Sequence, residues 1–374
     1  MFWTKMKTTA AALICAIAVV SEGGVLAFRL SADEPKPPAE PASAISEMGK
    51  LAASMAPGTW AELKTKNIVE TIGSDGAGGA LFGYSEGGAW DPATRQFLYV
   101  GGDHNGVAEF ISYSADTNTW KRFPRPSWIP STNNGSSTIH GYDHNAINPA
   151  TGDFYHRQFG LNMVHKYRIA TGTWSNLPPI ATEDWLAGAT GVEYYPELGG
   201  LIVVNGAGGK GSVYLFSEKT QGWSTLVSKL PMGQYHNFAE YSPAHKVMIF
   251  GGGHEDPGTL YKLDNAGKVT ALKKPPIGLG IGKSIVTVDP IGGDFLVFGS
   301  NASFYAYDVI ADSWKLQNGT VPFFSPTREG PIWQTNATPV STYGVTMFVK
   351  FYRGEPSRAW VYLYKHSSPP KGKK

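Results

Sequence analysis

A proline recurs along most of this 374-residue chain at nearly constant spacing. Each recurring proline follows a short apolar stretch and precedes a tight turn and a second apolar stretch, such as residues 97–100. Proline starts turns and is excluded from the interior of β-sheets, so this pattern predicts a hairpin in every repeat. A fixed period of this kind indicates repeated supersecondary units. The prolines are Pro92, Pro149, Pro196, Pro243, Pro290 and Pro339, which lie 57, 47, 47, 47 and 49 residues apart.

Two aromatic positions complete each repeat. A third predicted strand carries a tyrosine, and a fourth begins with a tryptophan, which Val269 replaces once. The tyrosines are Tyr113, Tyr167, Tyr214, Tyr261, Tyr307 and Tyr362, and the tryptophans are Trp120, Trp174, Trp223 and Trp314. Four short strands in roughly 45 residues is the size of one propeller blade. The sequence therefore predicts an all-β fold, a six-bladed β-propeller with four antiparallel strands per blade.

The sixth repeat reaches Lys374 before a fourth strand begins. Residues 58–63 (GTWAEL) resemble residues 172–177 (GTWSNL), although they precede the first repeat. We therefore expect the N-terminal strand to complete the last blade by pairing near residues 359–364. Closure of this kind removes the exposed strand edges of an open sheet.

The glycine pairs Gly101-Gly102 and Gly251-Gly252, with the recurring tyrosines and tryptophans, resemble the Kelch and galactose-oxidase-type propellers over about residues 58 to 366. The resemblance implies the fold but not the activity, because such propellers include oxidases, epimerases, lyases and binding modules. Galactose-oxidase copper chemistry requires a tyrosine cross-linked to a cysteine. The single cysteine, Cys15, lies outside the repeats, so this chemistry is excluded.

The N-terminal residues predict export. Lys5 and Lys7 precede an apolar run at residues 10–20 and then small residues, as in a signal peptide, with an uncleaved anchor as the alternative. We expect a secreted, periplasmic or cell-surface protein. The expected organisation is a signal peptide at residues 1–30, a Pro-rich linker and short amphipathic helix at 31–57, the propeller at 58–366 and a basic tail at 367–374.

Charge argues against a nucleic-acid partner. The formal net charge is +2, and much of the basic excess lies at the two ends of the chain. Nucleic-acid binding requires a broad basic surface, which this distribution does not supply. The expected partner is instead a polysaccharide or another glycan, and no stable membrane domain is expected unless the N-terminal segment stays uncleaved as an anchor.

One face of the predicted propeller is rich in histidine. Strand direction places the loops that lead into each first strand, here named lead-in loops, on the same face as the loops between second and third strands. Five of the nine histidines lie on these loops, whereas the opposite loops are mostly simple turns. This asymmetry predicts one functional face.

The residue types on this face suit β-elimination of a uronate-containing polysaccharide. That reaction needs a base, an acid and a group that neutralises the carboxylate, which His, Tyr and Arg supply without a cofactor. The face loosely resembles propeller polysaccharide lyases of the ulvan type, which are usually longer and seven-bladed. The candidate catalytic residues are His144, His236, Tyr142 and Tyr235, and the candidate substrate-binding residues are Arg157, His104, His140, Asn145, Asn237 and His254.

Other functions stay open. The main alternative is a non-catalytic Kelch-type module for glycan or protein, since Trp128, Trp185, Tyr84 and Phe323-Phe324 could stack on sugars. A sialic acid epimerase of Kelch type is less favoured, because only the blades match. No cofactor is expected, with zinc (on His104, His140 and His144) or calcium as the alternative. Glu193 and Glu240 fit either a wet central channel or a catalytic role.

Overall fold

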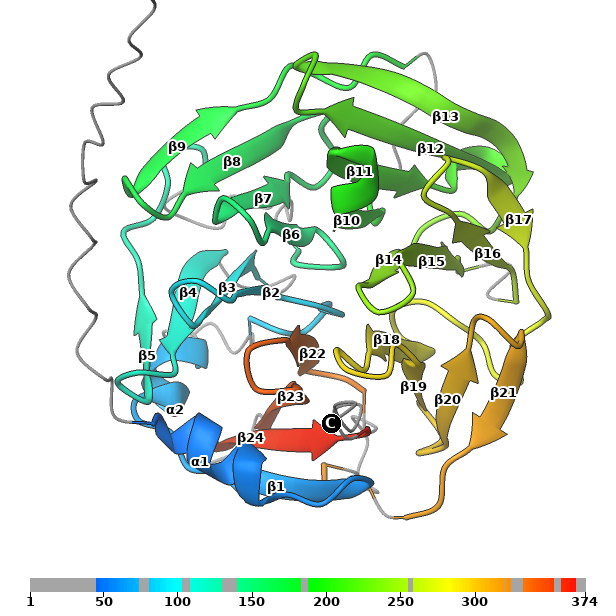
Figure 1. Ribbon diagram of the computed structural model, residues 1–374. Coiled ribbons are helices and arrows are strands. Elements are labelled where there is room, and N and C mark those ends of the chain that lie inside the picture. Colours follow the sequence, from blue (N-terminus) through cyan, green and yellow to red (C-terminus); the bar gives the residue numbers. More distant parts are fainter. Residues whose placement is uncertain are drawn as a thin grey trace, which may run out of the picture. The chain divides into compact units, whose positions relative to one another are not determined.

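The computed structural model describes residues 45–73, 81–102, 108–129, 140–182, 188–254, 258–319, 321–323, 332–352 and 358–367. All described residues lie in one compact unit, Ala44–Lys374. In this unit six four-stranded antiparallel sheets surround a central axis (Figure 1). The predicted all-β, six-bladed propeller is therefore confirmed.

In blades one to five the strands run in chain order from the axis outward, and in blade six the N-terminal strand β1 is the outermost. Blade one contains β2 (Ala89–Asp91), β3 (Gln96–Gly101), β4 (Glu109–Ser114) and β5 (Thr119–Arg122). Blade two contains β6 (Asn145–Asn148), β7 (Asp153–Arg157), β8 (Val164–Arg168) and β9 (Thr173–Asn176). Blade three contains β10 (Gly191–Tyr195), β11 (Gly200–Asn205), β12 (Lys210–Ser217) and β13 (Gly222–Pro231), with the 3₁₀ turns η1 (Pro196–Leu198) and η2 (Ala207–Gly209).

The second half of the ring repeats this order. Blade four contains β14 (Asn237–Ser242), β15 (Val247–Gly252), β16 (Leu260–Leu263) and β17 (Val269–Ala271). Blade five contains β18 (Ser284–Val288), β19 (Phe295–Gly299), β20 (Phe304–Asp308) and β21 (Ser313–Leu316). Blade six contains β22 (Thr335–Val340), β23 (Val345–Tyr352), β24 (Arg358–Lys365) and the N-terminal strand β1 (Thr59–Leu63).

The recurring aromatic residues pack as pairs across the third and fourth strands. In blades one, two and five the expected tyrosine and tryptophan face each other, with ring centroids 5.2 Å (Tyr113–Trp120), 5.0 Å (Tyr167–Trp174) and 4.4 Å (Tyr307–Trp314) apart. In blade three Trp223 packs on Phe216 rather than Tyr214. Side chains two residues apart share a face of a strand, so this shift keeps the ring on the same side.

Strand β1 closes the ring as predicted. It pairs antiparallel with β24, and Trp60 lies opposite Tyr364. The Trp60 ring also contacts Phe298 of blade five and Phe348 of blade six, at centroid distances of 5.9 and 5.1 Å. The closing strand therefore adds an aromatic contact between two blades as well as backbone hydrogen bonds.

A short helix precedes the closing strand, at the expected place. Helix α1 (Glu47–Ser54) buries Met48 and Ala52, and the Ser46 hydroxyl caps its first turn by accepting the Gly49 N–H. A second helix, α2 (Ile68–Ile72), follows β1. Within the described residues, neither helix has the length and apolar character needed to cross a lipid bilayer.

Hydrogen bonds between neighbouring lead-in segments tie the blades together at the axis. The Tyr142 N–H donates to the Tyr84 carbonyl at 2.6 Å, and the Glu86 N–H donates to the Tyr142 carbonyl at 3.1 Å. Blades two and three are joined by a hydrogen bond in which the Val192 N–H donates to the Asp143 carbonyl at 2.8 Å. Blades one and six are joined in the same way, because the Ala337 N–H donates to the Glu86 carbonyl at 3.0 Å.

Two buried carboxyl groups extend these links by one more blade. Asp143 Oδ2 accepts the N–H of Ala239 on β14 of blade four, at 2.7 Å. Glu86 Oε1 accepts the N–H of Val286 on β18 of blade five, at 2.8 Å. Each acid therefore connects three blades, two, three and four for Asp143 and one, six and five for Glu86.

We expect Trp60→Ala to lower the free energy of unfolding by about 3 kcal/mol, because it removes a large aromatic side chain from the contact between blades five and six. Urea denaturation followed by tryptophan fluorescence and circular dichroism measures the change. Ile310→Ala is the control, since Ile310 is 67% exposed and its loss should cost less than about 0.5 kcal/mol. Equal effects of the two substitutions would contradict the assigned role of Trp60.

Candidate functional site

Tyr142 is the centre of a group of rings at the lead-in end of the axis. Its ring centroid lies 5.0 Å from that of His140, 5.5 Å from His144 and 5.8 Å from His236. Phe159 stacks on it at 5.5 Å. The structure thus brings residues of blades two and four together.

Small residues at the start of blade three make this approach possible. Gly188, Ala189 and Gly191 lie between the lead-in segments of blades two and four, and Ala189 packs in one cluster with Tyr142. A Cβ at Gly188 would lie 2.2 Å from the Phe159 ring, and one at Gly191 would lie 2.5 Å from the Phe238 carbonyl carbon. Larger side chains at these glycines would separate the rings.

Three residues of the ring group have left-handed backbone conformations. The φ angles are +35° at Tyr142, +56° at Tyr235 and +53° at His236. Such values are unfavourable for aromatic residues and persist only where the surroundings impose them, often at binding sites. They also break the alternation of a strand, so side-chain direction here does not follow strand parity.

His144 is completely buried, and its Nε2 atom lies within hydrogen-bond distance of two N–H donors. Its Nε2 accepts the N–H of Thr190 at 3.2 Å and lies 3.4 Å from Nη1 of Arg157. Burial lowers the pKa of the imidazole well below its usual range, and the Arg157 charge lowers it further. With both donors on Nε2, the proton of the neutral ring lies on Nδ1. In this arrangement His144 positions Arg157 and the start of blade three.

Arg157 is buried with it. Nη1 donates to the Gly188 carbonyl at 2.9 Å, and burial lowers the pKa of the guanidinium to about 9. The side chain therefore keeps its charge at neutral pH.

The two candidate asparagines bind backbone. Asn145 Oδ1 accepts the Val100 N–H at 2.9 Å, and its amide nitrogen donates to the Val100 carbonyl. Asn237 Oδ1 accepts the Gly206 N–H at 2.9 Å, and its amide donates to the Gly233 carbonyl. Both side chains thus attach the first strand of one blade to the blade before it.

The remaining candidates differ in exposure. His140 is buried, with Nδ1 3.4 Å from the Gly102 carbonyl oxygen. His236 and Tyr235 are half-buried, and His254 is exposed. Burial and the neighbouring His254 lower the pKa of His236 to about 4, so its ring is neutral at physiological pH. His104 lies outside the described residues.

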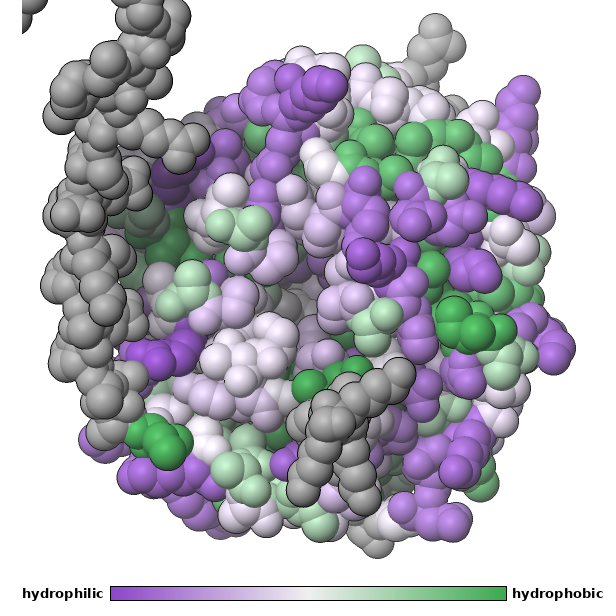
Figure 2. Space-filling view, in the orientation of Figure 1, coloured by the Kyte–Doolittle hydropathy of each residue, from purple (hydrophilic) through white to green (hydrophobic). Residues whose placement is uncertain are grey.

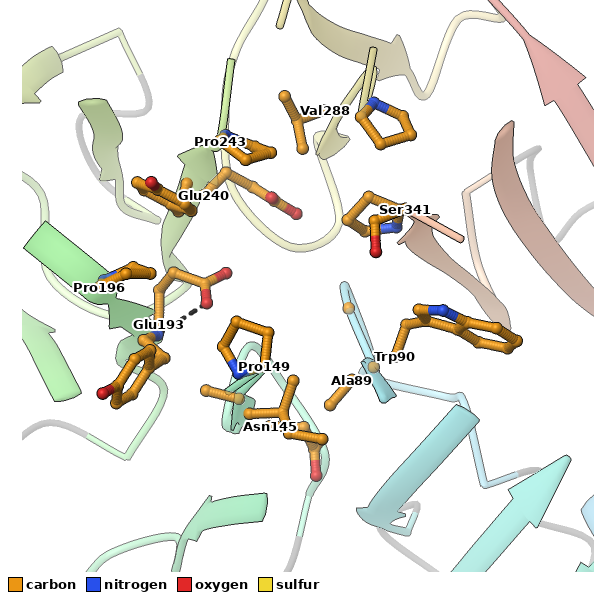
Figure 3. Close-up of a pocket in the computed structure, with 18 of the residues that line it drawn as sticks. Ala89, Trp90, Asn145, Pro149, Glu193, Pro196, Glu240, Pro243, Val288 and Ser341 are labelled. Carbon is orange, nitrogen blue, oxygen red and sulfur yellow. Dashed lines mark hydrogen bonds between the residues drawn. The ribbon is translucent and has the colours of Figure 1, made fainter. Parts of the chain in front are cut away.

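The opposite end of the axis contains a cavity of about 170 Å³. Its rim is formed by the turns after the first strands, and the side chains of Glu193 and Glu240 point into it (Figure 3). Glu193 Oε1 accepts the N–H of Tyr194 at 2.7 Å. Asp143 lies on the wall of the same cavity.

Four acids therefore surround the axis, and burial raises the pKa of each. The pKa of Asp143 rises to about 8, and those of Glu86, Glu193 and Glu240 are raised well above their usual range. Repulsion from Asp143 contributes to the shifts of Glu86 and Glu193, and repulsion from Glu193 to that of Glu240. The axis thus favours protons or a bound cation over free carboxylates.

Comparison with known proteins supports the fold but gives no information on the chemistry of the site. No protein-family model and no curated protein sequence matches this chain. A structural genomics protein of unknown function from Bacteroides thetaiotaomicron is similar in structure, with a TM-score of 0.52 at 14% identity over 81% of this chain and 75% of that one. A chain of a nidogen/laminin complex gives a TM-score of 0.46 at 12% identity over 63% and 80%. At 14% identity the Bacteroides protein shows the fold alone.

Several sequence-based assignments of surface aromatics need correction. Phe323 is 5% exposed and packs in the core with Phe298 and Phe348, so it is not available to stack on a sugar. Trp128 stacks on His165 at a centroid distance of 3.8 Å. Trp185 and Phe324 lie outside the described residues. Among the residues with described positions, no group of three or more His, Cys, Asp or Glu is arranged to hold a metal ion.

Sequence reasoning also missed residues that shape the site. Glu86 and Asp143 were not among the candidates, although both occur in lead-in loops. The sequence gives little indication of their role, because an acid occupies this position, relative to the recurring proline, only in the first two repeats. Trp333 was missed as a neighbour of Tyr84, which it contacts at 5.3 Å.

We expect the free energy of unfolding to fall between pH 7 and pH 8.5. The folded-state pKa values of these acids lie above those of the unfolded chain, so folding retains protons, and the resulting stabilisation is lost as pH rises through the folded-state pKa. Each acid that keeps its proton only in the folded state contributes a slope of up to about 1.4 kcal/mol per pH unit. The lowered pKa values of His144 and His156 act in the opposite direction below pH 6.5, so the measurement starts at pH 7.

Asp143→Asn should flatten this slope, because the amide oxygen still accepts the Ala239 N–H but no proton is exchanged. Chemical denaturation at several pH values measures this slope, and Glu70→Gln, a substitution at an exposed position, is the control. A slope that Asp143→Asn leaves unchanged would show that this group does not retain a proton on folding.

Proposed function

We propose that this protein is a glycan-binding propeller whose binding surface is the lead-in end of the axis. The observation that carries the proposal is a line of rings across several blades. Consecutive centroids are 5.3, 6.0, 5.8 and 5.5 Å apart along Trp333, Tyr84, Tyr142, His236 and His254. Apart from Tyr142, these rings are at least partly exposed.

The chemistry of these rings suits sugars. Aromatic rings offer flat apolar faces to the C–H groups of a pyranose, and their polar edges bond to hydroxyl groups. A row of such rings supports an extended ligand, such as an oligosaccharide, over a small compact one. The export expected from the N-terminal sequence would place this surface outside the cytoplasm, where polysaccharides are found.

Binding is favoured over catalysis because several polar residues proposed from the sequence form hydrogen bonds within the fold instead of facing a ligand. The His144 Nε2 holds Thr190 and Arg157, and Asn145 and Asn237 bind backbone groups. A general base must reach the proton that it removes, and a fully buried histidine does not. The proposed surface therefore recognises its ligand mainly through ring faces.

Cleavage of a uronate polysaccharide is the second candidate, and one observation favours it. His236 is half-buried, neutral at physiological pH, and 5.8 Å from the Tyr142 ring. In this version His236 removes the proton beside the uronate carboxylate, and the phenol of the half-buried Tyr235 protonates the leaving oxygen. The base is thus His236, not His144.

We expect Trp333→Leu to weaken binding of the best ligand on a glycan array by about tenfold, because a stacked ring contributes about 1.4 kcal/mol beyond an aliphatic replacement. Trp333→Phe retains a ring and should lose less than Trp333→Leu. The comparison is read by calorimetric titration of the same oligosaccharide. Absence of binding across neutral and uronate-containing glycans would contradict the proposal.

The lyase candidate has its own readout. If it is correct, a uronate polysaccharide should give the ultraviolet absorbance of an unsaturated uronate, and His236→Ala should reduce the rate by about 10²-fold or more. Binding without any absorbance leaves the binding module as the function. His144→Ala serves as the structural comparison, since it should lower stability by leaving the Thr190 N–H and the Arg157 guanidinium without this acceptor.

A further inference from the structure

The position three residues before the recurring proline lines the axial cavity in blades one to four, and its chemistry differs between blades. Blades three and four carry glutamate there, whereas the other blades carry small or neutral residues. The six residues are Ala89, Ala146, Glu193, Glu240, Thr287 and Asn336. The acidic pair is therefore a local feature of one side of the cavity and not a consequence of the repeat.

The carboxyl group of Glu240 is directed into the cavity without a partner. Glu240 is 6% exposed, and no described residue donates a hydrogen bond to its carboxyl group. Figure 3 shows the Glu240 and Glu193 side chains both extending from the wall toward the open centre. An unpaired buried carboxylate is costly, so the group favours either a proton or a cationic ligand.

The size and the apolar lining of the cavity favour an organic cation over a bare metal ion. Its volume is about 170 Å³, and most of the rim away from the acids is apolar. No described set of His, Cys, Asp or Glu could enclose a metal ion. Aliphatic chains pack on such surfaces while a terminal charge reaches a carboxylate. The apolar rim includes Pro149, Pro196, Pro243, Pro290, Pro339 and Val288.

We propose that this cavity binds a primary alkylammonium group, with the ammonium between Glu193 and Glu240 and the carbon chain along the prolines. The ligand has two sources, a free amine or a lysine of the chain's own C-terminal residues. The last described residue, Ser367, lies beside the turn of Pro290, because a Cβ at Gly292 would be 2.6 Å from its Oγ. Lys371, Lys373 and Lys374 follow within seven residues.

The test is calorimetric titration of the full chain with n-butylammonium chloride, with n-butanol as the uncharged probe of the same shape. We expect saturable binding of the ammonium only, weakened about tenfold or more by Glu240→Gln, since a charge-assisted hydrogen bond is lost. Glu47→Gln is the matched control, because it removes the same charge from an exposed position outside the cavity. Affinity should increase from pH 5 to pH 8, as the carboxyl groups must release protons to bind the cation.

A variant ending at Ser367 distinguishes the sources. Tighter n-butylammonium binding by this variant than by the full chain identifies the tail lysines as a competing occupant, and equal binding identifies a free amine. No saturable binding to either form, or equal binding of n-butanol, would overturn the proposal. If Glu240→Gln does not fold, the comparison of the two probes on the natural chain still decides.

This site is independent of the proposed glycan surface. The cavity opens among the turns after the first strands, whereas the line of rings lies on the loops before them. Loss of amine binding by Glu240→Gln should therefore leave glycan binding unchanged.

Discussion

Hydrogen bonds from backbone N–H groups to the carboxyl groups of Asp143 and Glu86 determine how the blades meet at the axis. In a propeller the innermost strands diverge, so their edges cannot pair along their whole length with those of the next blade. Asp143 bridges this gap on one side of the ring, reaching Ala239 of blade four, and Glu86 does so on the other, reaching Val286 of blade five. The arrangement buries two acids, and its electrostatic cost appears in their raised pKa values.

The same links position both ends of the axis. Tyr142 lies directly before Asp143, and its carbonyl accepts the backbone N–H of Glu86, so the backbone that carries the central ring of the lead-in face is held next to both acids. At the other end, repulsion from Asp143 contributes to the raised pKa values of Glu193 and Glu240. Ring surface and acidic cavity are thus two products of one set of backbone contacts. The face of the molecule in Figure 2 shows hydrophilic side chains interspersed with scattered hydrophobic ones.

The fold could be predicted from the sequence because its signals repeat. Six turn prolines and the Trp60 strand specify the number of blades and their closure, and both are confirmed. Fine register was less accessible, since Tyr214 and Phe216 lie on the same face and only packing selects which one meets Trp223. Chain order places the lead-in loops of His144 and His236 on one face, but it does not show that His144 is buried, because that burial depends on the packing around it and on its contacts with Thr190 and Arg157.

The pairing of β1 with β24 also has a consequence for how the molecule is made. The two strands lie about 300 residues apart in sequence, and contacts of such long range form late because they require most of the chain to be ordered first. On the ribosome, β1 emerges early and has no partner until the last strand has been synthesised. The first five blades can be complete while the ring is still open, so a chain stopped anywhere before β24 retains unpaired edges on β1 and on its final strand. Such edges pair readily with other chains. Closure of the ring by β1 therefore requires that β24 has been synthesised.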